Sequence, residues 1–399
     1  MEYFAPTRYC AIGPFICVDL FSGAGGLAAG FRDAGFSVLS GSDIDPSAAT
    51  TFRKNFPESS FFLGNITDLR ASDLMRDGGF KRGGLDCLIG GPPCQAFSYN
   101  NHQRSIAHVR AGLFREYLRI VRTLRPQTLV MENVPGILTI GNGAILDEIY
   151  RALESLGYEC RAKILYAEDF GSPQQRRRVF FIATRRVWDD NLFPPGICKP
   201  VAKPKSNLFV HDWIPTESED CYLRVNVWSA IGDLPSLRNG AKRDKPKPYR
   251  FAAQTWLQQH LRGRQRLARN HNGNIIGSKM VERIRHVPQG GSWRDIPRRL
   301  LPTGMKRALR SDHTRRYGRL RRTGVCCTIL TKCDPHWGSY IHPTSDRVIT
   351  VREAARLQTF KDNFHFTGPL SSQYVQVGNA VPPLLAQAVA EAIVAHLTG

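Results

Sequence analysis

The feature that most constrains the fold is an apolar run that leads directly into a turn of glycine and proline. Residues 85–89 read Leu-Asp-Cys-Leu-Ile, which is typical of a buried strand, and Gly-Gly-Pro-Pro-Cys-Gln follows at 90–95. Proline stiffens such a turn, and glycine allows it unusual backbone angles. Because open α/β sheets bind ligands at the carboxyl ends of their strands, Cys94 is placed for nucleophilic attack. A buried structural cysteine is the alternative when Cys94 is taken alone.

An earlier apolar run also ends in a turn. Residues 15–21 predict a strand, and Ser-Gly-Ala-Gly-Gly-Leu follows at 22–27, with a helix expected from Gly26. A turn of this kind lets backbone N–H groups approach a ligand closely. It is an imperfect dinucleotide fingerprint, because Ala28 stands where the third glycine is expected.

The next predicted strand, residues 37–45, ends in carboxylates. Asp43 lies about twenty residues beyond the glycine turn, the spacing at which an acidic side chain accepts hydrogen bonds from a ribose. Asp45 precedes Pro46 and an apparent helix, so we predict that Asp45 caps this helix. Asp43 is therefore the better ribose ligand.

Taken together, these segments resemble the cytosine-C5 DNA methyltransferases of the bacterial type, which use S-adenosylmethionine. The resemblance covers residue 19 to about residue 386, nearly the whole chain, and keeps the family's motif order. Its six motifs are the cofactor turn at 19–26, the nucleophile loop at 90–98, Glu-Asn-Val at 132–134, Gln-Gln-Arg-Arg-Arg at 174–178, the ninth motif at 347–360 and Gly-Asn-Ala-Val-Pro-Pro at 378–383. Each motif alone is modest evidence for the family, whereas six motifs in the family's order are specific evidence for it.

The resemblance implies an α/β fold with a Rossmann-like, mostly parallel twisted sheet of the class I methyltransferase type and a second, smaller, loop-rich DNA-recognition domain. It implies that S-adenosylmethionine is bound by Asp19, Phe21, Gly23, Gly25, Gly26, Asp43, Ile44, Asn65, Ile66, Pro92, Asn379 and Ala380. The implied catalytic residues are Cys94, Glu132, Arg176 and Arg178, and the DNA contacts implied near the nucleophile are Gln95, Ser98 and Arg104.

The chemistry of the residues agrees. Cytosine C5 is a poor nucleophile until a thiolate adds to C6 and forms an enamine. This addition needs a proton on ring N3, or a strong hydrogen bond to it. Glu132 follows the apolar run at 128–131, so we expect it at a strand end, where partial burial would suit it to acid chemistry. A helix-capping or salt-bridged glutamate would be the preferred interpretation without Cys94. Stacking shields C6 in a duplex, so we expect the target base to flip out.

Arg176 and Arg178 are two residues apart and precede a predicted strand at 179–183. In an extended chain their side chains lie on the same side, where arginines can bond the base O2 and fix the shape of the site. A solvated basic run is the alternative. By resemblance, Arg178 is the base contact.

The formal net charge of +21 points to a polyanionic partner, double-stranded DNA. The ten cysteines include no CxxC pair and no zinc-type spacing, so we expect reduced thiols and no metal. We see no apolar stretch of transmembrane length and no signal-peptide pattern. We therefore expect a monomer in the bacterial cytosol, without membrane contact and nucleoid-associated when bound to DNA.

The positive charge is concentrated in residues 261–322, which hold 18 Lys and Arg and three acidic residues. Interleaved glycines and aromatics favour a phosphate-contacting surface over a merely solvated face. By resemblance, the target recognition domain lies in this part of the chain. We predict phosphate contacts from Arg262, Arg264 and Arg266, and base-reading contacts from Arg294, Arg315 and Arg319.

Three segments are predicted from these landmarks: a catalytic and cofactor-binding domain at 1–187, completed by 376–399, a target recognition domain at 188–345, and a hinge with a bridging helix at 346–375. Two residues depart from the family's pattern. Asn65 stands where the family often has Asp, and Thr359 stands where glycine is common.

The predicted function is methyl transfer to C5 of cytosine within a specific duplex sequence, by an enzyme with a separate cognate restriction endonuclease or by one acting alone. An RNA (tRNA) cytosine-C5 methyltransferase on the same scaffold is one alternative, although its Cys-Phe-Thr signature is not found. A non-catalytic DNA-binding protein is the other, against which intact Cys94, Glu132, Arg176 and Arg178 argue.

Overall fold

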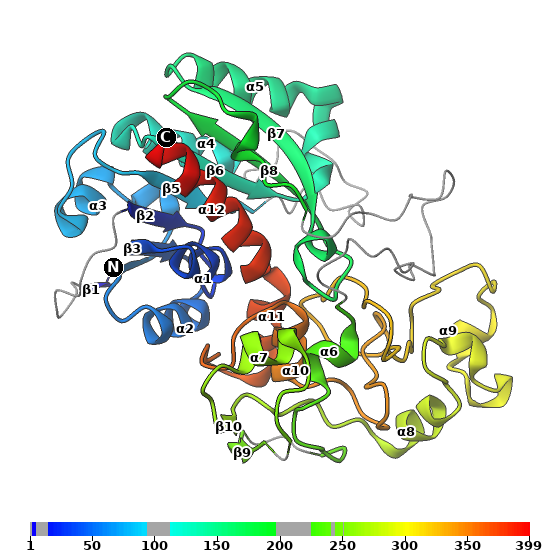
Figure 1. Cartoon of the computed structure of the whole chain (residues 1–399). Coiled ribbons are helices and arrows are strands. Elements are labelled where there is room, and N and C mark those ends of the chain that lie inside the picture. The colour runs from blue at the N-terminus through cyan, green and yellow to red at the C-terminus, as the bar shows by residue number, and fades with distance from the viewer. Residues whose placement is uncertain (1, 5–14, 94–111, 197–224, 241–243, 250) are drawn as a thin grey trace. The chain divides into compact units, whose positions relative to one another are not determined.

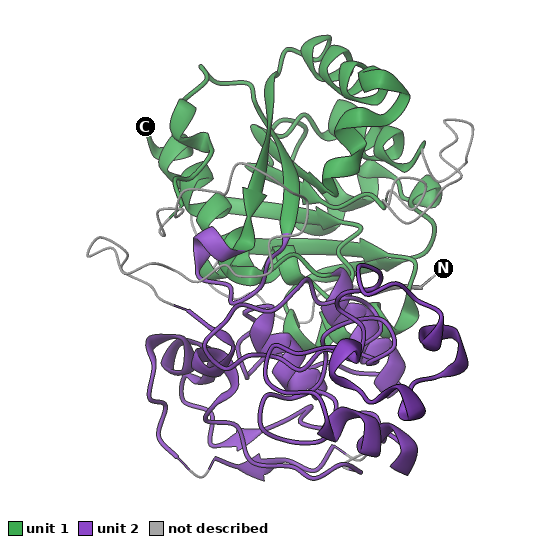
Figure 2. Cartoon of the chain, turned by 90° about the vertical axis from the view of Figure 1, so that its right-hand side faces the viewer, with its two compact units in different colours: residues 1–167, 177–196, 380–399 green, residues 168–176, 197–379 purple. Residues whose placement is uncertain are grey.

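A computed structural model of the chain describes residues 2–4, 15–93, 112–196, 225–240, 244–249 and 251–399. The chain divides into two compact units (Figure 2). Unit 1 comprises residues 1–167, 177–196 and 380–399, and unit 2 comprises residues 168–176 and 197–379. Both units are therefore assembled from segments that are distant in the sequence.

Unit 1 is built on an eight-stranded sheet (Figure 1). Its strands are β1 (Glu2–Phe4), β2 (Phe15–Leu20), β3 (Phe36–Asp43), β4 (Ser60–Leu63), β5 (Cys87–Gly90), β6 (Thr128–Asn133), β7 (Glu159–Tyr166) and β8 (Arg177–Thr184). They lie in the order β1-β4-β3-β2-β5-β6-β8-β7. The strands β4, β3, β2, β5 and β6 are parallel, whereas β1, β8 and β7 make antiparallel pairs. The predicted mostly parallel α/β sheet is confirmed.

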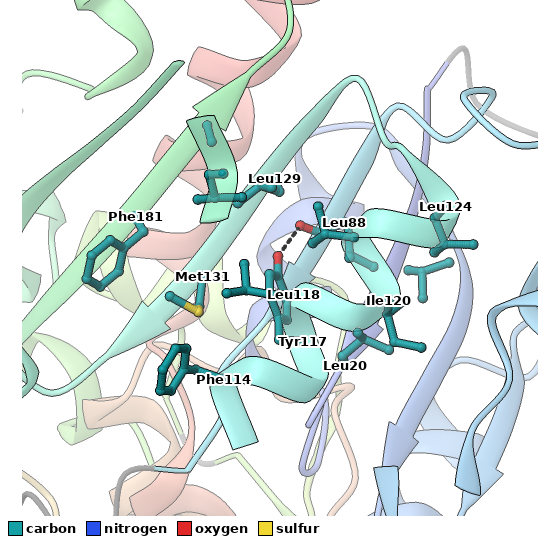
Figure 3. Packing of buried hydrophobic residues seen from close by; sticks show 14 of the residues in the cluster. Leu20, Leu88, Phe114, Tyr117, Leu118, Ile120, Leu124, Leu129, Met131 and Phe181 are labelled. Atoms are coloured by element: carbon teal, nitrogen blue, oxygen red, sulfur yellow. Dashed lines mark hydrogen bonds between the residues drawn. The ribbon is translucent and has the colours of Figure 1, made fainter. Parts of the chain in front are cut away.

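Helices cover this sheet because its central strands are apolar on both faces. The helices of unit 1 are α1 (Gly26–Asp33), α2 (Pro46–Asn55), α3 (Ala71–Gly78), α4 (Leu113–Leu124), α5 (Ala144–Glu154) and α12 (Pro383–Thr398). Apolar residues of α3, α4 and α5 share one core with the strands. Figure 3 shows α4 in this core, where the Tyr117 hydroxyl donates to the Leu88 carbonyl at 2.8 Å. The buried phenol is thereby satisfied.

The last helix packs tightly on the first. A Cβ on Gly30 of α1 would lie 2.4 Å from Cβ of Ala386 in α12, so only glycine permits this approach. One stretch of the described residues, Leu370–Thr398, is long and apolar enough to pass a test for a membrane-spanning helix. This stretch consists of two helices, however: α11 (Leu370–Asn379) in unit 2 and α12 in unit 1. More than half of its most apolar part, 56%, is buried inside the protein.

The predicted strands at 15–21, 37–45, 85–89, 128–131 and 179–183 correspond to β2, β3, β5, β6 and β8. The predicted helix from Gly26 is α1. Asp45 caps α2 as predicted, because its Oδ1 accepts a hydrogen bond of 2.7 Å from the Ser47 N–H.

Unit 2 has short elements joined by long irregular segments. They are α6 (Val227–Ile231), β9 (Lys247–Pro248), α7 (Trp256–Arg262), β10 (Leu267–Ala268), α8 (Ser278–Arg285), α9 (Thr303–Lys306), α10 (Val351–Leu357) and α11, with 3-10 turns η7 (Trp293–Asp295) and η8 (Arg298–Leu300). Helix α10 lies within the segment 346–375, for which a bridging helix is predicted, and it ends at Leu357. Thr359 has φ +68°, in the left-handed region that favours glycine, which gives a physical reason for glycine at this position in the family.

Buried ion pairs organise unit 2. Arg356 of α10 pairs with Asp233 and, at 2.6 Å, with Asp362, and none of the three side chains is exposed. Arg347 pairs with Glu353 at 2.7 Å, and both are buried. The predicted bridging segment, 346–375, belongs to unit 2, as do residues 168–176, and its ion-paired residues Arg347, Glu353, Arg356 and Asp362 are buried.

Candidate active site

Four parallel neighbours, β3, β2, β5 and β6, end at the same edge of the sheet in unit 1. From β2 the chain proceeds outward to β3, whereas β5 and β6 lie on the other side of β2. Such a topological switch point is where open α/β sheets bind ligands. The predicted residues Asp19, Asp43, Pro92 and Glu132 all lie in or directly after these strands.

The glycine turn after β2 has a backbone that few residue types can adopt. Phe21, Gly23 and Gly25 have φ values of 55°, 53° and 95°. A Cβ on Gly25 would lie 2.6 Å from the Phe56 ring, whereas one on Gly23 would meet no described atom within 4 Å. Gly26 begins α1, whose N-terminus has no side-chain cap. Open space therefore lies beside Gly23 at the N-terminal end of α1, whereas the N–H groups of Gly23 and Gly25 donate within the protein, to Asp43 and to the Ser22 carbonyl.

Asp43 holds this turn in place. Its Oδ2 accepts a hydrogen bond from the Gly23 N–H at 2.8 Å, and its Oδ1 accepts one from the Asp45 N–H at 2.9 Å. Burial raises the pKa of the Asp43 carboxyl, and these backbone bonds oppose the rise. The Ile44 N–H is a third backbone donor to this carboxyl, and since a carboxylate has about four acceptor positions, Asp43 can still accept from a ribose hydroxyl.

Asp19, near the end of β2, is a buried acid without a cation. Burial raises its pKa to about 8, the Ala28 N–H opposes this rise by hydrogen bonding, and Asp43 adds to it by repulsion. Its side chain is 1% exposed, and Oδ2 has no hydrogen-bond partner among the described residues. A buried polar atom in this state fits a site that a bound donor group completes.

Three predicted cofactor residues follow β3 and β4. Ile44 is 69% exposed and offers an apolar surface beside Asp43. The Asn65 Oδ1 accepts a hydrogen bond of 3.2 Å from the Thr67 N–H, so this oxygen caps a turn and has one lone pair left for an adenine amino group. Ile66 is 6% exposed and packs into the core, which leaves only its backbone for ligand contact.

The turn after β5 leads to the predicted nucleophile. The Asn133 side chain donates to the Pro92 carbonyl at 3.0 Å, and its own Oδ1 accepts from the Val134 N–H at 2.9 Å. Asn133 thus ties the end of β6 to the Gly-Gly-Pro-Pro turn. Cys94 itself lies outside the described residues, as do the predicted DNA contacts Gln95, Ser98 and Arg104.

Glu132 and Arg178 form an ion pair beside this turn. Arg178 Nε lies 2.7 Å from Glu132 Oε1, and the side chains are 15% and 13% exposed. A Cβ on Gly91 would lie 3.1 Å from Glu132 Oε2, so one carboxylate oxygen faces the arginine and the other faces the turn. The structure therefore brings together these two predicted catalytic residues, on the antiparallel neighbours β6 and β8.

Arg176 has a different environment from Arg178. It belongs to unit 2, is 0% exposed, and donates to the carbonyls of Ile329 at 3.2 Å and Gly378 at 2.9 Å. Burial of a guanidinium is tolerable when carbonyls accept its protons. The Nη1 and Nη2 donors of Arg176 join segments of unit 2, and this burial argues against the predicted contact with a base.

Sequence reasoning assigned no role to Asn133 or Gly378. For Asn133, its position directly after Glu132 is the one feature of the sequence that indicates a role near the active site. A Cβ on Gly378 would lie 2.4 Å from the Leu330 carbonyl carbon, so this glycine allows two backbones to touch. The partner segment is 48 positions away in the chain, and no local pattern indicates it.

The predicted base reader Arg319 is a structural residue. It is 8% exposed, and its guanidinium donates to the carbonyls of Val287, Ile284, His342 and Ser345 and to Asp346 Oδ1. These five acceptors satisfy the side chain inside unit 2, so its burial argues against the predicted base contact of Arg319. Arg315 is exposed and Arg294 is half-buried, and both stay predictions.

The described cysteines are free thiols. Among the described residues, no group of three His, Cys, Asp or Glu side chains is placed to hold a metal ion.

Comparison with known proteins agrees with this geometry. The model of the C-5 cytosine-specific DNA methylase family matches residues 15–395. The chain is 35% identical over 380 residues to the type II methyltransferase M1.HphI of Haemophilus parahaemolyticus, covering 94% of this chain and 86% of that protein. It is 31% identical over 426 residues to the type II methyltransferase M.AgeI of Thalassovita gelatinovora, covering 94% and 98%.

Among solved structures, a putative DNA modification methyltransferase encoded within an Escherichia coli prophage superposes with a TM-score of 0.73. The superposition covers 96% of this chain and all of that one, at 24% identity, and therefore supports the fold.

Proposed function

The chain belongs to the C-5 cytosine-specific DNA methylase family and is a DNA (cytosine-5-)-methyltransferase, and we propose that it acts by covalent addition of Cys94 to the target base. The observation that carries this proposal is the Glu132–Arg178 pair, held 2.7 Å apart beside the turn that leads to Cys94. C5 chemistry needs an acid and a nucleophile, and here Glu132 lies near the end of β6 while the neighbouring strand β5 is followed in the sequence by Cys94.

In the proposed mechanism, the Cys94 thiolate forms a bond from Sγ to C6 of cytosine. The electron pair of the C5–C6 double bond shifts to the C4–C5 bond, and the C4–N3 pair moves onto N3, which takes a proton from Glu132, so that an enamine forms. S-adenosylmethionine, when bound, supplies the electrophilic methyl group for C5. Once C5 carries the methyl group, the N3 proton returns to Glu132, and C5 gives up its proton to solvent. The C–H electron pair re-forms the C5–C6 double bond as the Sγ–C6 bond breaks, and the thiolate leaves.

Arg178 is proposed to orient Glu132 and to contact the base. Its Nε is engaged by Glu132, and Nη1 donates to the Arg177 carbonyl at 2.8 Å. A guanidinium carries five N–H donors, so further donors are available to cytosine O2. Arg176 is proposed to act only as a structural residue of unit 2.

The cofactor is proposed to lie at the ends of β2, β3 and β5. The fit is supported by the unpartnered Asp19 Oδ2, by the open space beside Gly23 and by exposed Ile44. Asp43 would receive the ribose hydroxyls, and Ile44 would cover the adenine ring. Asn65, Ile66, Pro92, Asn379 and Ala380 keep the cofactor contacts that the motif resemblance implies.

Unit 2 is proposed to bind and read duplex DNA, and the target cytosine is proposed to flip out to meet Cys94. The basic residues at 261–322 support this assignment. We also propose that the enzyme acts as a monomer. It either has a separate cognate restriction endonuclease or acts alone.

The test measures labelled methyl transfer from S-adenosylmethionine to duplex DNA and to tRNA. We expect transfer to DNA by the wild type and none by Cys94→Ala, whereas Cys160→Ala, the matched control in β7, keeps activity. A duplex with 5-fluorocytosine should trap an adduct on the Cys94 peptide, because fluorine at C5 blocks the final elimination. Substantial product from Cys94→Ala, or transfer to tRNA alone, would overturn the proposal.

A further inference from the structure

The buried state of Arg319 raises the question of which arginines of unit 2 are held for contact with bases. A base-reading arginine needs an exposed guanidinium whose plane is fixed, because its fork must meet two acceptors at once. A phosphate-binding arginine needs only charge and reach. Rigid support is therefore the feature that separates these two roles.

Arg321 has such support. A Cβ on Gly290 would lie 2.9 Å from Arg321 Nε, 3.0 Å from Nη2 and 3.3 Å from Cζ, so the guanidinium lies directly over the Gly290 backbone. Gly290 also has φ +78°, where other residue types are strained. Arg321 is nevertheless exposed. Glycine at 290 thus provides a flat surface for this one side chain.

Arg322 is supported by an aromatic ring. Its Cζ lies 4.1 Å from the ring centroid of Trp228, within the range of a cation–π contact. Its backbone N–H donates to Gln289 Oε1 at 3.0 Å, and its carbonyl accepts from the Trp228 N–H at 3.0 Å. Arg322 is exposed as well. The neighbouring side chain therefore also has a fixed plane.

The backbone under both arginines is held from two sides. The Gly290 N–H donates to the Arg319 carbonyl at 2.9 Å, the Arg319 N–H donates to Gly291 at 3.2 Å, and the Leu320 N–H donates to Ile341 at 2.9 Å. The buried Arg319 side chain anchors the same segment. Other arginines stacked on rings, Arg262 on Tyr249 and Arg316 on Trp337, are half-buried.

We infer that Arg321 and Arg322 are specificity-determining residues that read guanine in the major groove of the duplex. Guanine is the base that presents O6 and N7 as paired acceptors for an arginine fork. Arg319 positions them and makes no DNA contact. This inference rests on the proposed function, because it assumes that unit 2 meets duplex DNA.

The test uses the full-length protein and a duplex library with randomised bases around a cytosine. Bisulfite sequencing after reaction with S-adenosylmethionine gives the base preference at each position. We expect the wild type to require guanine, and Arg321→Lys and Arg322→Lys each to lose about 5- to 150-fold of discrimination at one guanine position. Lysine keeps the charge, so the salt slope of DNA binding should not change.

Gly290→Ala is the second variant. It removes no charge but displaces the Arg321 guanidinium, so it should weaken the preference for guanine at the same position of the DNA site as Arg321→Lys does. Thermal denaturation checks that the variant is folded. Arg307→Ala, an exposed arginine at the end of α9, is the control that should leave all preferences intact.

Three results would overturn the inference. The first is a wild-type site without guanine, and the second is unchanged preference in both lysine variants. The third is uniform weakening on all sequences by Arg321→Ala that lysine restores, which would make these residues phosphate contacts. The proposed function fails separately, by absence of methylcytosine with the wild type.

Discussion

Asp19 in unit 1 and Glu353 in unit 2 are each 1% exposed, yet their pKa values move in opposite directions. Burial raises the pKa of Asp19 to about 8, with Asp43 as a like-charged neighbour. Burial acts on Glu353 in the same sense, but Arg347 and His342 outweigh it and hold the pKa of Glu353 well below its usual range. The charge of the neighbours, rather than burial, therefore decides the protonation state.

The two regions around these acids differ in the same way. The strand ends of unit 1 hold polar groups with incomplete partners, whereas unit 2 pairs its buried acids with arginines. Perturbed groups without internal partners are typical of functional sites, and fully paired networks are typical of structural cores. Changes in unit 1 should thus cost activity, and changes in the ion-pair network of unit 2 should cost stability.

The largest expected effect is catalytic and comes from Glu132→Gln. Glutamine can still accept from Arg178 but cannot hold a proton at N3, so kcat should fall by about 10²–10⁴-fold. Cofactor affinity and the free energy of unfolding should change little. Steady-state kinetics measure kcat and the apparent cofactor affinity, and chemical denaturation measures the free energy of unfolding. The control is Glu148→Gln, which changes the ion-pair partner of Arg115. An unchanged kcat would make Glu132 structural and would break the comparison.

Arg356→Met should have the next largest effect, on stability. The change removes the shortest ion pairs of buried Asp233 and Asp362 and leaves them only Arg262 and Arg352, each at 3.7 Å, which should lower the free energy of unfolding by about 3–5 kcal/mol. Arg76→Met removes exposed ion pairs with Asp73 and Asp77 and should leave stability nearly unchanged, because water and salt screen charges at the surface. Urea denaturation measures the free energy of unfolding of both variants. Equal decreases would contradict the view that the buried ion pairs contribute more to stability than the exposed ones.

The pH dependence of stability should separate Asp19 from Glu353. Because the pKa of Asp19 is raised from 3.8 to about 8 on folding, its contribution is full below pH 3.8 and is lost as the pH rises through about 8. Asn mimics the protonated acid, so Asp19→Asn should flatten the loss of stability over this window. Denaturation midpoints measured across the window test this.

Glu353 should behave in the opposite sense. Its pKa is lowered on folding from 4.5, so its contribution is present above pH 4.5 and is lost as the pH falls below that value. Glu353→Gln should therefore remove part of the acid sensitivity, at the cost of leaving Arg347 unpaired. If the stability of this variant fell more steeply at low pH than that of the wild type, the expected direction of the Glu353 contribution would be wrong.

The smallest expected effect distinguishes two arginines that are two residues apart. Arg262 lies 3.9 Å from the Tyr249 ring and donates to the Phe251 carbonyl at 2.6 Å, whereas Arg264 is exposed. Arg264→Ala should leave stability unchanged and make the salt dependence of DNA binding shallower by about one ion. Arg262→Ala should lower stability by about 1–3 kcal/mol, through lost packing and an unsatisfied carbonyl. Binding titrations at several salt concentrations, with denaturation, test both.

The sequence by itself determined five strands of the sheet, the places where they end and the order of the catalytic motifs; the five strands are β2, β3, β5, β6 and β8. Each of these is a local pattern: an apolar run of strand length is followed by turn residues, and the polar groups of Asp43 and Glu132 come where the run stops. The antiparallel placement of β8 next to β6, which brings Arg178 to Glu132, could not be predicted, because strand pairing joins segments about 45 residues apart.

Only the tertiary structure decided which arginines are buried. Arg176 and Arg178 are two residues apart, as are Arg319 and Arg321, and within each pair the environments differ completely. An arginine is buried where the folded chain supplies enough carbonyl and carboxylate acceptors, and those of Arg319 come from residues 284, 287, 342, 345 and 346. Since these acceptors meet only after folding, a run of arginines indicates charge but not which guanidinium faces DNA.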